Sequence, residues 1–196
     1  MSEIRLRKAK LAKGGTVEAS YIDEDGNDVT LKGKNICHAD LKTAFAGLVP
    51  FLADLTEQKE AEYIDWDDLN KAETVEKLRY LEVTGFSVTD DDVNPMVTLI
   101  GKRTLRTSKV LNLCAPATAL NTDTESYELC DELDIALQVC ISEVELYVTE
   151  RKWQVKQNTL DFDNPEDPFA AATPTDDAPL PEDVPQPEGQ APEHVA

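Results

Sequence analysis

The longest uninterrupted helical pattern in the chain runs from Asn121 to Trp153, and it constrains the fold more than any other feature. Its apolar residues recur three or four positions apart, which places them on one face of a helix. Thr122 followed by Glu125 predicts a capping box at the start. Such a helix would be about 45 Å long, so we expect the preceding residues to pack along it. The predicted buried face consists of Leu129, Leu133, Leu137, Cys140, Val144 and Tyr147.

Segments in which polar and apolar residues alternate precede this helix and predict antiparallel strands. The first covers residues 4–11 and is followed by a pair of glycines. The next two cover residues 16–22 and 28–32. They flank Asp25-Gly26, a dipeptide that favours the tight turn of a β-hairpin. We therefore expect a first hairpin group at the N-terminal end of the chain.

A second hairpin group is predicted for residues 78–89 and 96–107, followed by a short strand at residues 110–114. Between the two groups, residues 39–55 have the spacing of an amphipathic helix. Pro50 should kink or break this helix, because proline removes a backbone donor and clashes with the preceding turn.

Strands followed by a helix thus occur twice along the chain. This order is typical of an α+β fold, in which helices cover one face of an antiparallel sheet. We predict one α+β domain at residues 1–158, with a sheet built from the two hairpin groups and packed against the long C-terminal helix and the shorter kinked helix. The two halves do not align residue by residue, so the pattern does not establish a duplication.

The predicted tail, residues 159–196, differs from the rest of the chain in composition. Residues 161–196 contain eight of the eleven prolines and ten acidic residues, but no lysine or arginine. Such a segment buries too little apolar surface to offset the entropy of ordering it, so we predict a disordered acidic tail. The preceding residues are acidic as well, with 29 acids and 19 bases. A body of this charge argues against a general binder of duplex DNA, which needs a broad basic surface.

The sequence lacks the patterns of membrane proteins, secreted proteins and the commonest enzymes. No apolar run approaches the ~20 residues that span a bilayer, and the start has no apolar signal segment, which predicts a cytoplasmic protein without a membrane partner. The four cysteines form no CxxC pair, so we expect reduced structural thiols and no zinc site. Phosphate-loop, dinucleotide, metalloprotease and hydrolase motifs are missing. We expect no metal, no cofactor and no enzymatic activity.

Two local patterns suggest chemistry but fit simpler explanations. Asp23, Asp25 and Asn27 are spaced like calcium ligands, yet the loop lacks the glycine and glutamate that an EF-hand needs, which favours an ordinary turn. Cys37 precedes His38, but neighbours in sequence rarely present both side chains to one substrate, and no third catalytic residue is apparent. We interpret His38 as a residue that flanks the start of the following helix.

Basic residues are concentrated on the predicted strands and at their ends. If these strands lie side by side, the protein acquires a basic sheet face that suits single-stranded nucleic acid, with Tyr21, Tyr80 or Phe86 as stacking platforms. The alternative is that these side chains protect exposed strand edges from aggregation. The predicted nucleic-acid-binding residues are Arg5, Arg7, Lys32, Lys34, Lys102, Arg103, Arg106 and Lys109.

Asp161 to Phe169 in the tail read Asp-Phe-Asp-Asn-Pro-Glu-Asp-Pro-Phe. This segment resembles the acidic tip of bacterial single-stranded-DNA-binding proteins, which recruits replication and repair enzymes by placing a terminal phenylalanine in a pocket. The resemblance implies a docking role for Phe169, and we assign Phe162 to the same partner site. It covers nine residues and departs from the family, since 27 residues follow Phe169 here. The family's all-β barrel also differs from the order of elements predicted above.

These observations predict a non-enzymatic accessory protein, of a kind that would suit a virus, that binds single-stranded nucleic acid in replication or recombination. Its acidic tail would recruit a protein partner. The alternative is a protein-binding module, either an inhibitor or a structural subunit, that uses its acidic surface and self-associates through its long helix. In that alternative Trp66, which is flanked by aspartates, would insert into a pocket of the partner.

Overall fold

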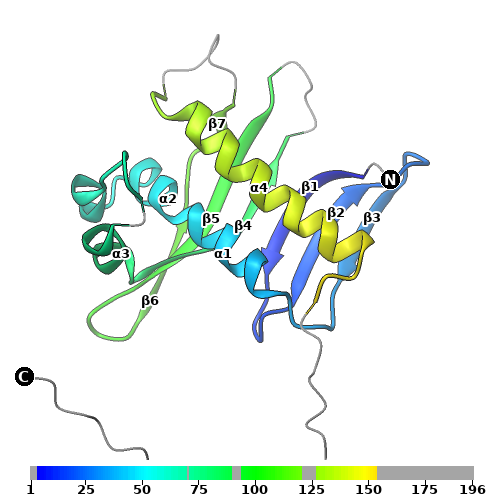
Figure 1. Ribbon diagram of the computed structural model, residues 1–196, viewed down its shortest axis with the longest axis horizontal. Helices are drawn as coiled ribbons and strands as arrows, with labels where there is room; N and C mark the ends of the chain where they lie inside the picture. The colour runs from blue at the N-terminus through cyan, green and yellow to red at the C-terminus, as the bar shows by residue number, and fades with distance from the viewer. Residues whose placement is uncertain (1–3, 70, 90–93, 121–126, 154–196) are drawn as a thin grey trace, which may run out of the picture. The chain divides into compact units, whose positions relative to one another are not determined.

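An antiparallel sheet with helices packed on one of its faces forms the fold of this protein (Figure 1). The computed structural model describes residues 4–69, 71–89, 94–120 and 127–153. The predicted α+β class is confirmed, with a sheet packed against a long C-terminal helix and a shorter, interrupted one. The predicted tail at residues 159–196 lies outside the described residues.

The first hairpin group consists of β1 (Arg5–Leu11), β2 (Val17–Ile22) and β3 (Asp28–Lys32). Gly14 and Gly15 turn the chain between β1 and β2 at φ values of +88° and +79°, which residues with a side chain rarely adopt. In the β2–β3 turn, Asp23 Oδ1 accepts hydrogen bonds from the backbone N–H groups of Asp25 and Asn27 at 3.0 and 2.8 Å. The carboxylate of Asp23 therefore holds the predicted hairpin turn.

The second hairpin group consists of β4 (Leu81–Val88), β5 (Met96–Thr104) and β6 (Val110–Cys114), with the short strand β7 (Thr118–Ala119) beside β5. Neighbouring strands are antiparallel throughout, and the sheet order is β3-β2-β1-β4-β5-β6. The strand predicted to start at Leu78 starts at Leu81. The preceding residues form α3 (Ala72–Leu78), in which Thr74 and Leu78, four positions apart, are both buried.

Helices α1 (Ala39–Gly47) and α2 (Val49–Leu55) occupy the position of the predicted kinked helix. The break falls at Leu48, and Pro50 lies in the first turn of α2, where its missing N–H has no helical partner to lose. His38 caps α1, because its Nδ1 accepts a hydrogen bond from the backbone N–H of Asp40 at 3.4 Å. The position of His38 at the start of this helix is therefore confirmed.

The long C-terminal helix is α4 (Cys130–Thr149), and a short 3₁₀ helix, η1 (Lys59–Tyr63), lies between α2 and α3. At 1.5 Å per residue α4 is about 30 Å long, shorter than the sequence pattern predicted. Thr122 and Glu125 of the predicted capping box lie outside the described residues. The buried residues of α4 confirm the predicted face: Leu133, Leu137, Cys140, Val144 and Tyr147.

The core lies between the sheet and helices α1, α2 and α4 (Figure 1). Phe45 of α1 meets Phe86 of β4 near the middle of this layer, with ring centroids 5.8 Å apart. In the part of the chain that the structure describes, the helices that pack on the sheet all lie on this side (Figure 1). None of the described helices combines the length and the apolar character that crossing a bilayer requires.

The two halves of the sheet have the same order of elements. Three antiparallel strands and a helix occur as β1, β2, β3 and α1, and again as β4, β5, β6 and α4. Strands β1 and β4 pair at the centre, so the sheet order is symmetric about them. The repeat of strands and helix in the sequence therefore corresponds to a repeat of topology.

Candidate functional site

The face of the sheet that points away from the helices carries most of the charged strand residues. Successive side chains of a strand point to opposite faces. Ala9 and Ala19 are buried on the helix side, so Lys8, Lys10 and Glu18 point the other way. We call this side the open face. Its basic residues are Arg5, Arg7, Lys8, Lys10, Lys32 and Lys102, and its acidic residues are Glu18, Asp28 and Glu82.

Two ion pairs neutralise part of the open face. Arg7 Nη1 lies 2.5 Å from Asp28 Oδ1, and this pair connects β1 to β3 across β2. Lys102 Nζ lies 2.9 Å from Glu82 Oε2, and this pair connects β5 to β4. Both pairs are partly exposed to solvent, where such interactions are weak and sensitive to salt.

The remaining lysines of the open face are not held by carboxylates. Glu18 lies opposite Lys10 on β1 and opposite Lys32 on β3 in the strand register. Within the described residues, however, neither of these lysines nor Lys8 forms an ion pair. Their ammonium groups are therefore available to an anionic ligand.

A cleft opens in the sheet where β1 and β4 separate. The two strands pair only at Lys8–Lys10 and Gly85–Ser87, and a register shift between Val83 and Gly85 marks a bulge in β4. A Cβ atom on Gly85 would lie 2.8 Å from the backbone oxygen of Ala9, so glycine permits the close approach of the strands at this point. The cleft has a volume of about 940 Å³.

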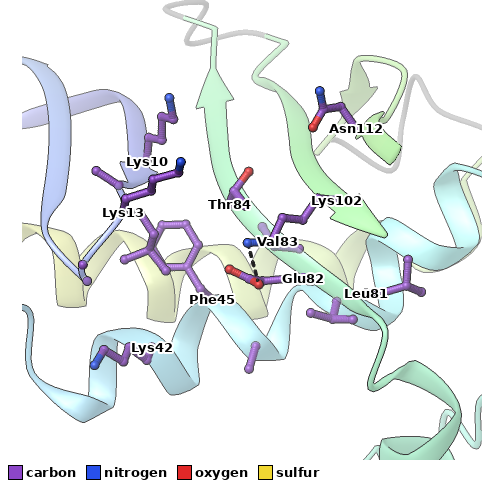
Figure 2. A pocket seen from close by; sticks show the side chains of 16 residues that line it. Lys10, Lys13, Lys42, Phe45, Leu81, Glu82, Val83, Thr84, Lys102 and Asn112 are labelled. Atoms are coloured by element: carbon purple, nitrogen blue, oxygen red, sulfur yellow. Dashed lines mark ion pairs between the residues drawn. The ribbon is translucent and has the colours of Figure 1, made fainter. Parts of the chain in front are cut away.

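Lysines converge on this cleft from both sides of the sheet opening. Figure 2 shows Lys10 and Lys13 on one side and Lys102 on the other, with the ring of Phe45 below the two lysines. Lys42 of α1 also lines the cleft. The turn that carries Lys13 is anchored, because its Gly15 oxygen accepts a hydrogen bond from the backbone N–H of Cys37 at 2.8 Å.

The charge balance of the cleft differs from that of the protein. Of the residues that the structure describes, Glu82 alone lines the cleft with a carboxylate, which is paired with Lys102. Among the described residues, Lys10, Lys13 and Lys42 form no ion pair. In a chain of formal charge −20, this is a local positive site with an apolar inner wall that includes Phe45 and Val83.

The structure brings some of the predicted basic residues together and separates others. Arg5, Arg7, Lys32 and Lys102 share the open face. Arg103 points to the helix side, where its guanidinium donates hydrogen bonds to Gln58 Oε1 at 2.8 Å and to Glu60 Oε1 at 2.5 Å. The others lie beyond the ends of strands: Lys34 after β3, and Arg106 and Lys109 in the β5–β6 turn.

The predicted nucleic-acid-binding residues did not include Lys10, Lys13 or Lys42, the three lysines of the cleft that form no ion pair among the described residues. Lys10 and Lys13 belong to the basic N-terminal stretch, but the sequence does not reveal where β1 parts from β4. Lys42 lies on a helix, and its side chain approaches the Gly14-Gly15 turn, with Cε 3.4 Å from the position of a Cβ atom on Gly15. The pair of glycines was the available signal of a tight turn at this place.

The aromatic residues considered as stacking platforms do not lie on the open face. Phe86 is fully buried, and Tyr21 faces the helix side with Leu6 as its register partner. Tyr80 lies before β4, with the guanidinium carbon of Arg79 4.6 Å from its ring centroid. Any contact with nucleic acid at the open face would therefore rest on the phosphate backbone.

The predicted partner residues lie away from the open face or outside the described residues. Trp66 is partly buried and packs against Phe51 of α2, with ring centroids 5.5 Å apart. Phe162 and Phe169 lie outside the described residues.

The adjacent residues Cys37 and His38 differ in their surroundings in the described part of the chain. Burial raises the pKa of the Cys37 thiol, which disfavours the nucleophilic thiolate. His38 Nδ1 lies 3.1 Å from Asp40 Oδ2, on the exposed cap of α1. No group of three or more His, Cys, Asp or Glu side chains is arranged to hold a metal ion within the described residues.

No protein family, curated protein or solved structure matches this chain.

Proposed function

We propose that this protein is a non-enzymatic binder of single-stranded nucleic acid, which it contacts through the open face and the lysine-lined cleft. The observation that carries the proposal is the set of lysines at the cleft of an otherwise acidic protein, Lys10, Lys13 and Lys42, which form no ion pair within the part of the chain that the structure describes. Acids outnumber bases two to one in the chain, so cations without carboxylate partners point to an external anion.

A single strand suits this surface better than a duplex. The positive site is small and is flanked by the acids Glu18, Asp28 and Glu82, whereas a duplex presents a wide and rigid array of phosphates. A flexible strand can place consecutive phosphates on the lysines and avoid the carboxylates. Without aromatic platforms on the open face, we expect binding that is weak, salt-dependent and nearly independent of sequence.

The test is a fluorescence-anisotropy titration of labelled single-stranded and duplex DNA at several salt concentrations. The double variant Lys10→Gln/Lys13→Gln should bind the single strand more weakly. The slope of log K against log salt should fall in magnitude by about 1.4 if two phosphate contacts are lost.

The matched control is Lys59→Gln/Lys77→Gln, which removes the same charge from η1 and α3 on the helix side. An equal loss of affinity for single-stranded DNA in both double variants would mean that net charge alone drives the binding. Absence of binding by the wild-type protein at micromolar concentration would refute the proposal.

The acidic tail adds a proposed recruiting role for Phe162 and Phe169. Its support is the resemblance of Asp161–Phe169 to an acidic tip that docks a phenylalanine into a basic-rimmed pocket. In the full-length protein, Phe169→Ala should abolish capture of a purified replication or repair enzyme and leave DNA affinity unchanged. If Phe169→Ala captured the enzyme as well as the wild type does, the proposed recruiting role of Phe169 would be wrong.

A second candidate function is that of a protein-binding module. The observation in its favour is the exposure of Ile135 and Val139, two large apolar residues one turn apart on α4. In this case substitutions on α4 would abolish complex formation, and the lysines of the cleft could be neutralised without effect. Binding assays with both sets of variants distinguish the two functions.

A further inference from the structure

An apolar groove with an acidic rim lies between α1 and α4. Ile135 and Val139 line it and are 67% and 54% exposed, although such side chains are usually buried. Its volume is about 630 Å³. The acidic residues of its rim are Asp40, Glu132 and Glu143. Asp40 and Glu143 share the ammonium of Lys152, so these four groups keep a net negative charge, to which Glu132 contributes without this pairing.

A second exposed apolar surface has the opposite charge. It is the hairpin between β5 and β6, where Leu105, Val110 and Leu111 are 38%, 56% and 47% exposed. The same hairpin carries Arg106 and Lys109. Neither of these two residues forms an ion pair among the residues described.

The tip of this hairpin is held in a defined shape. Leu105 donates a backbone hydrogen bond to the oxygen of Lys109 at 2.8 Å, and Ser108 donates one to the oxygen of Leu105 at 2.9 Å. Ser108 adopts a φ of +60°, the left-handed conformation typical of tight turns. Because the turn is already formed, docking would order few additional torsions.

We propose that the hairpin between β5 and β6 of one copy docks into the α1–α4 groove of a second copy. The apolar side chain of Leu111 would cover Ile135 and Val139, while Val110, its neighbour on β6, points to the opposite face of the hairpin. The cations of the hairpin would face the acidic rim. This inference does not depend on nucleic-acid binding, since it uses neither the open face nor the cleft.

The other large exposed apolar residues have local explanations. Tyr63 lies beneath the ammonium of Lys77 at 4.5 Å, and Tyr80 lies beside the guanidinium of Arg79. Ile36 is near the Gly15 turn, and Val75 lines a separate pocket beside α3. The groove and the hairpin remain as two apolar surfaces of complementary charge.

A symmetric dimer through the groove alone is disfavoured. In such an interface the same surface meets itself, so Glu132 and Glu143 would face the carboxylates of the second groove. Like charges brought together in this way destabilise a complex. Hairpin-to-groove docking is head-to-tail and leaves one free groove and one free hairpin on each dimer, so further copies can be added.

The test uses sedimentation velocity of the full-length protein without nucleic acid, over a range of concentrations. The wild-type protein should associate as its concentration rises, and the association should weaken at high salt. The hairpin variant Arg106→Glu/Lys109→Glu and the groove variant Ile135→Lys/Val139→Lys should each remain monomeric. An unchanged circular dichroism spectrum verifies that each variant is folded.

Mixing the two variants gives the decisive result. The hairpin variant keeps an intact groove and the groove variant keeps an intact hairpin, so the mixture should form a 1:1 dimer and no larger species. The control Lys59→Glu/Lys77→Glu changes the charge by the same amount on η1 and α3 and should associate like the wild type. A monomeric wild-type protein at the highest concentration, association of either variant alone, or a mixture that stays monomeric would each overturn the proposal.

Discussion

The four cysteines differ in their surroundings. Cys37, Cys130 and Cys140 are buried, whereas Cys114 is exposed at the end of β6. Burial raises the pKa of Cys140 to about 12 and also raises the pKa of Cys37, because a thiolate is poorly solvated among apolar groups. All four are free thiols in the structure, and the predicted structural role fits the three buried ones but not the exposed Cys114.

We predict that a disulfide reagent such as DTNB at pH 8 modifies one thiol of the native protein rapidly and the other three only on unfolding. Cys114→Ser should abolish the rapid phase, since this side chain is accessible to the reagent. Cys114 also lies two residues from Asn112, which lines the cleft, so saturating single-stranded DNA should slow the phase. More than one rapidly reacting thiol would contradict the burial pattern.

Single residues also show where prediction from the sequence reached its limit. Arg103 and Lys102 are adjacent and equally basic, yet Lys102 lies on the open face and Arg103 is bonded to Glu60 on the helix side. Alternation predicts that the two point to opposite faces, but not which face the helices cover. The partners of Arg103 are more than 40 positions away in sequence and come together only in the fold.

The elements themselves follow from local patterns wherever these are long. The buried stripe of α4 matches the three- and four-residue spacing of its leucines, and the break at Leu48 follows from Pro50. Short elements escape the same reasoning. Strand β7 has two residues, and the turn of helix that buries Thr74 and Leu78 is too short to show a period.

Helix α4 allows a matched pair of core and surface substitutions. Leu137 is fully buried against the sheet, so Leu137→Ala should lower the free energy of unfolding by about 2–5 kcal/mol through lost burial and a residual cavity. Ile135→Ala, two positions away on the exposed side, should change it by about 0.5 kcal/mol or less. Urea denaturation at low protein concentration measures both values, and equal losses would contradict the orientation of α4.

At the scale of the whole molecule, Lys152 connects the end of α4 to the start of α1. Its Nζ lies 2.8 Å from Asp40 Oδ2 and 2.8 Å from Glu143 Oε2. The hydrogen bond from Lys152 lowers the pKa of Asp40 below its ordinary value of 3.8, and the bond to Asp40 raises the pKa of Lys152 above 10.5. Asp40 is exposed and Lys152 is partly exposed, so solvent weakens the interaction and the effect on stability is small.

The direction of the pH dependence follows from these two pKa shifts. The carboxylate of Asp40 stabilises the fold above its unfolded pKa of 3.8, and this stabilisation is lost as the pH falls through its lower folded pKa. The ammonium of Lys152 stabilises the fold below 10.5, and its contribution is lost as the pH rises through its higher folded pKa. The ion pair between Asp40 and Lys152 therefore contributes to stability at neutral pH, where both groups are charged.

We predict that Lys152→Met lowers Tm at pH 7 and that the difference from the wild type narrows as the pH falls below 3.8. Differential scanning fluorimetry at several pH values measures this change. Lys59→Met is the control, because Lys59 forms no ion pair in the described part of the chain. A difference that stays constant from pH 7 to the acid range would mean that lost packing, and not charge, causes it.

Fold class could be predicted from the sequence because it depends on the order of elements, which each local pattern specifies. The candidate site could not be predicted in full, because it depends on where two strands separate. Strands β1 and β4 are distant in sequence, and nothing in the sequence around Gly85 indicates that the two strands separate there to form a cleft. Lys42 reaches the cleft from α1, and a search confined to strands does not find it.

The short pairing of β1 with β4 joins the two halves of the sheet, β1–β3 and β4–β6, less extensively than neighbouring strands are joined within each half. Three residue pairs cross this joint, whereas five pairs join β2 to β3. Helices α1 and α4 also connect the two halves of the sheet, because α1 contacts β4 and α4 contacts β1. A ligand bound in the cleft would therefore contact both halves of the sheet beside the short pairing that joins them.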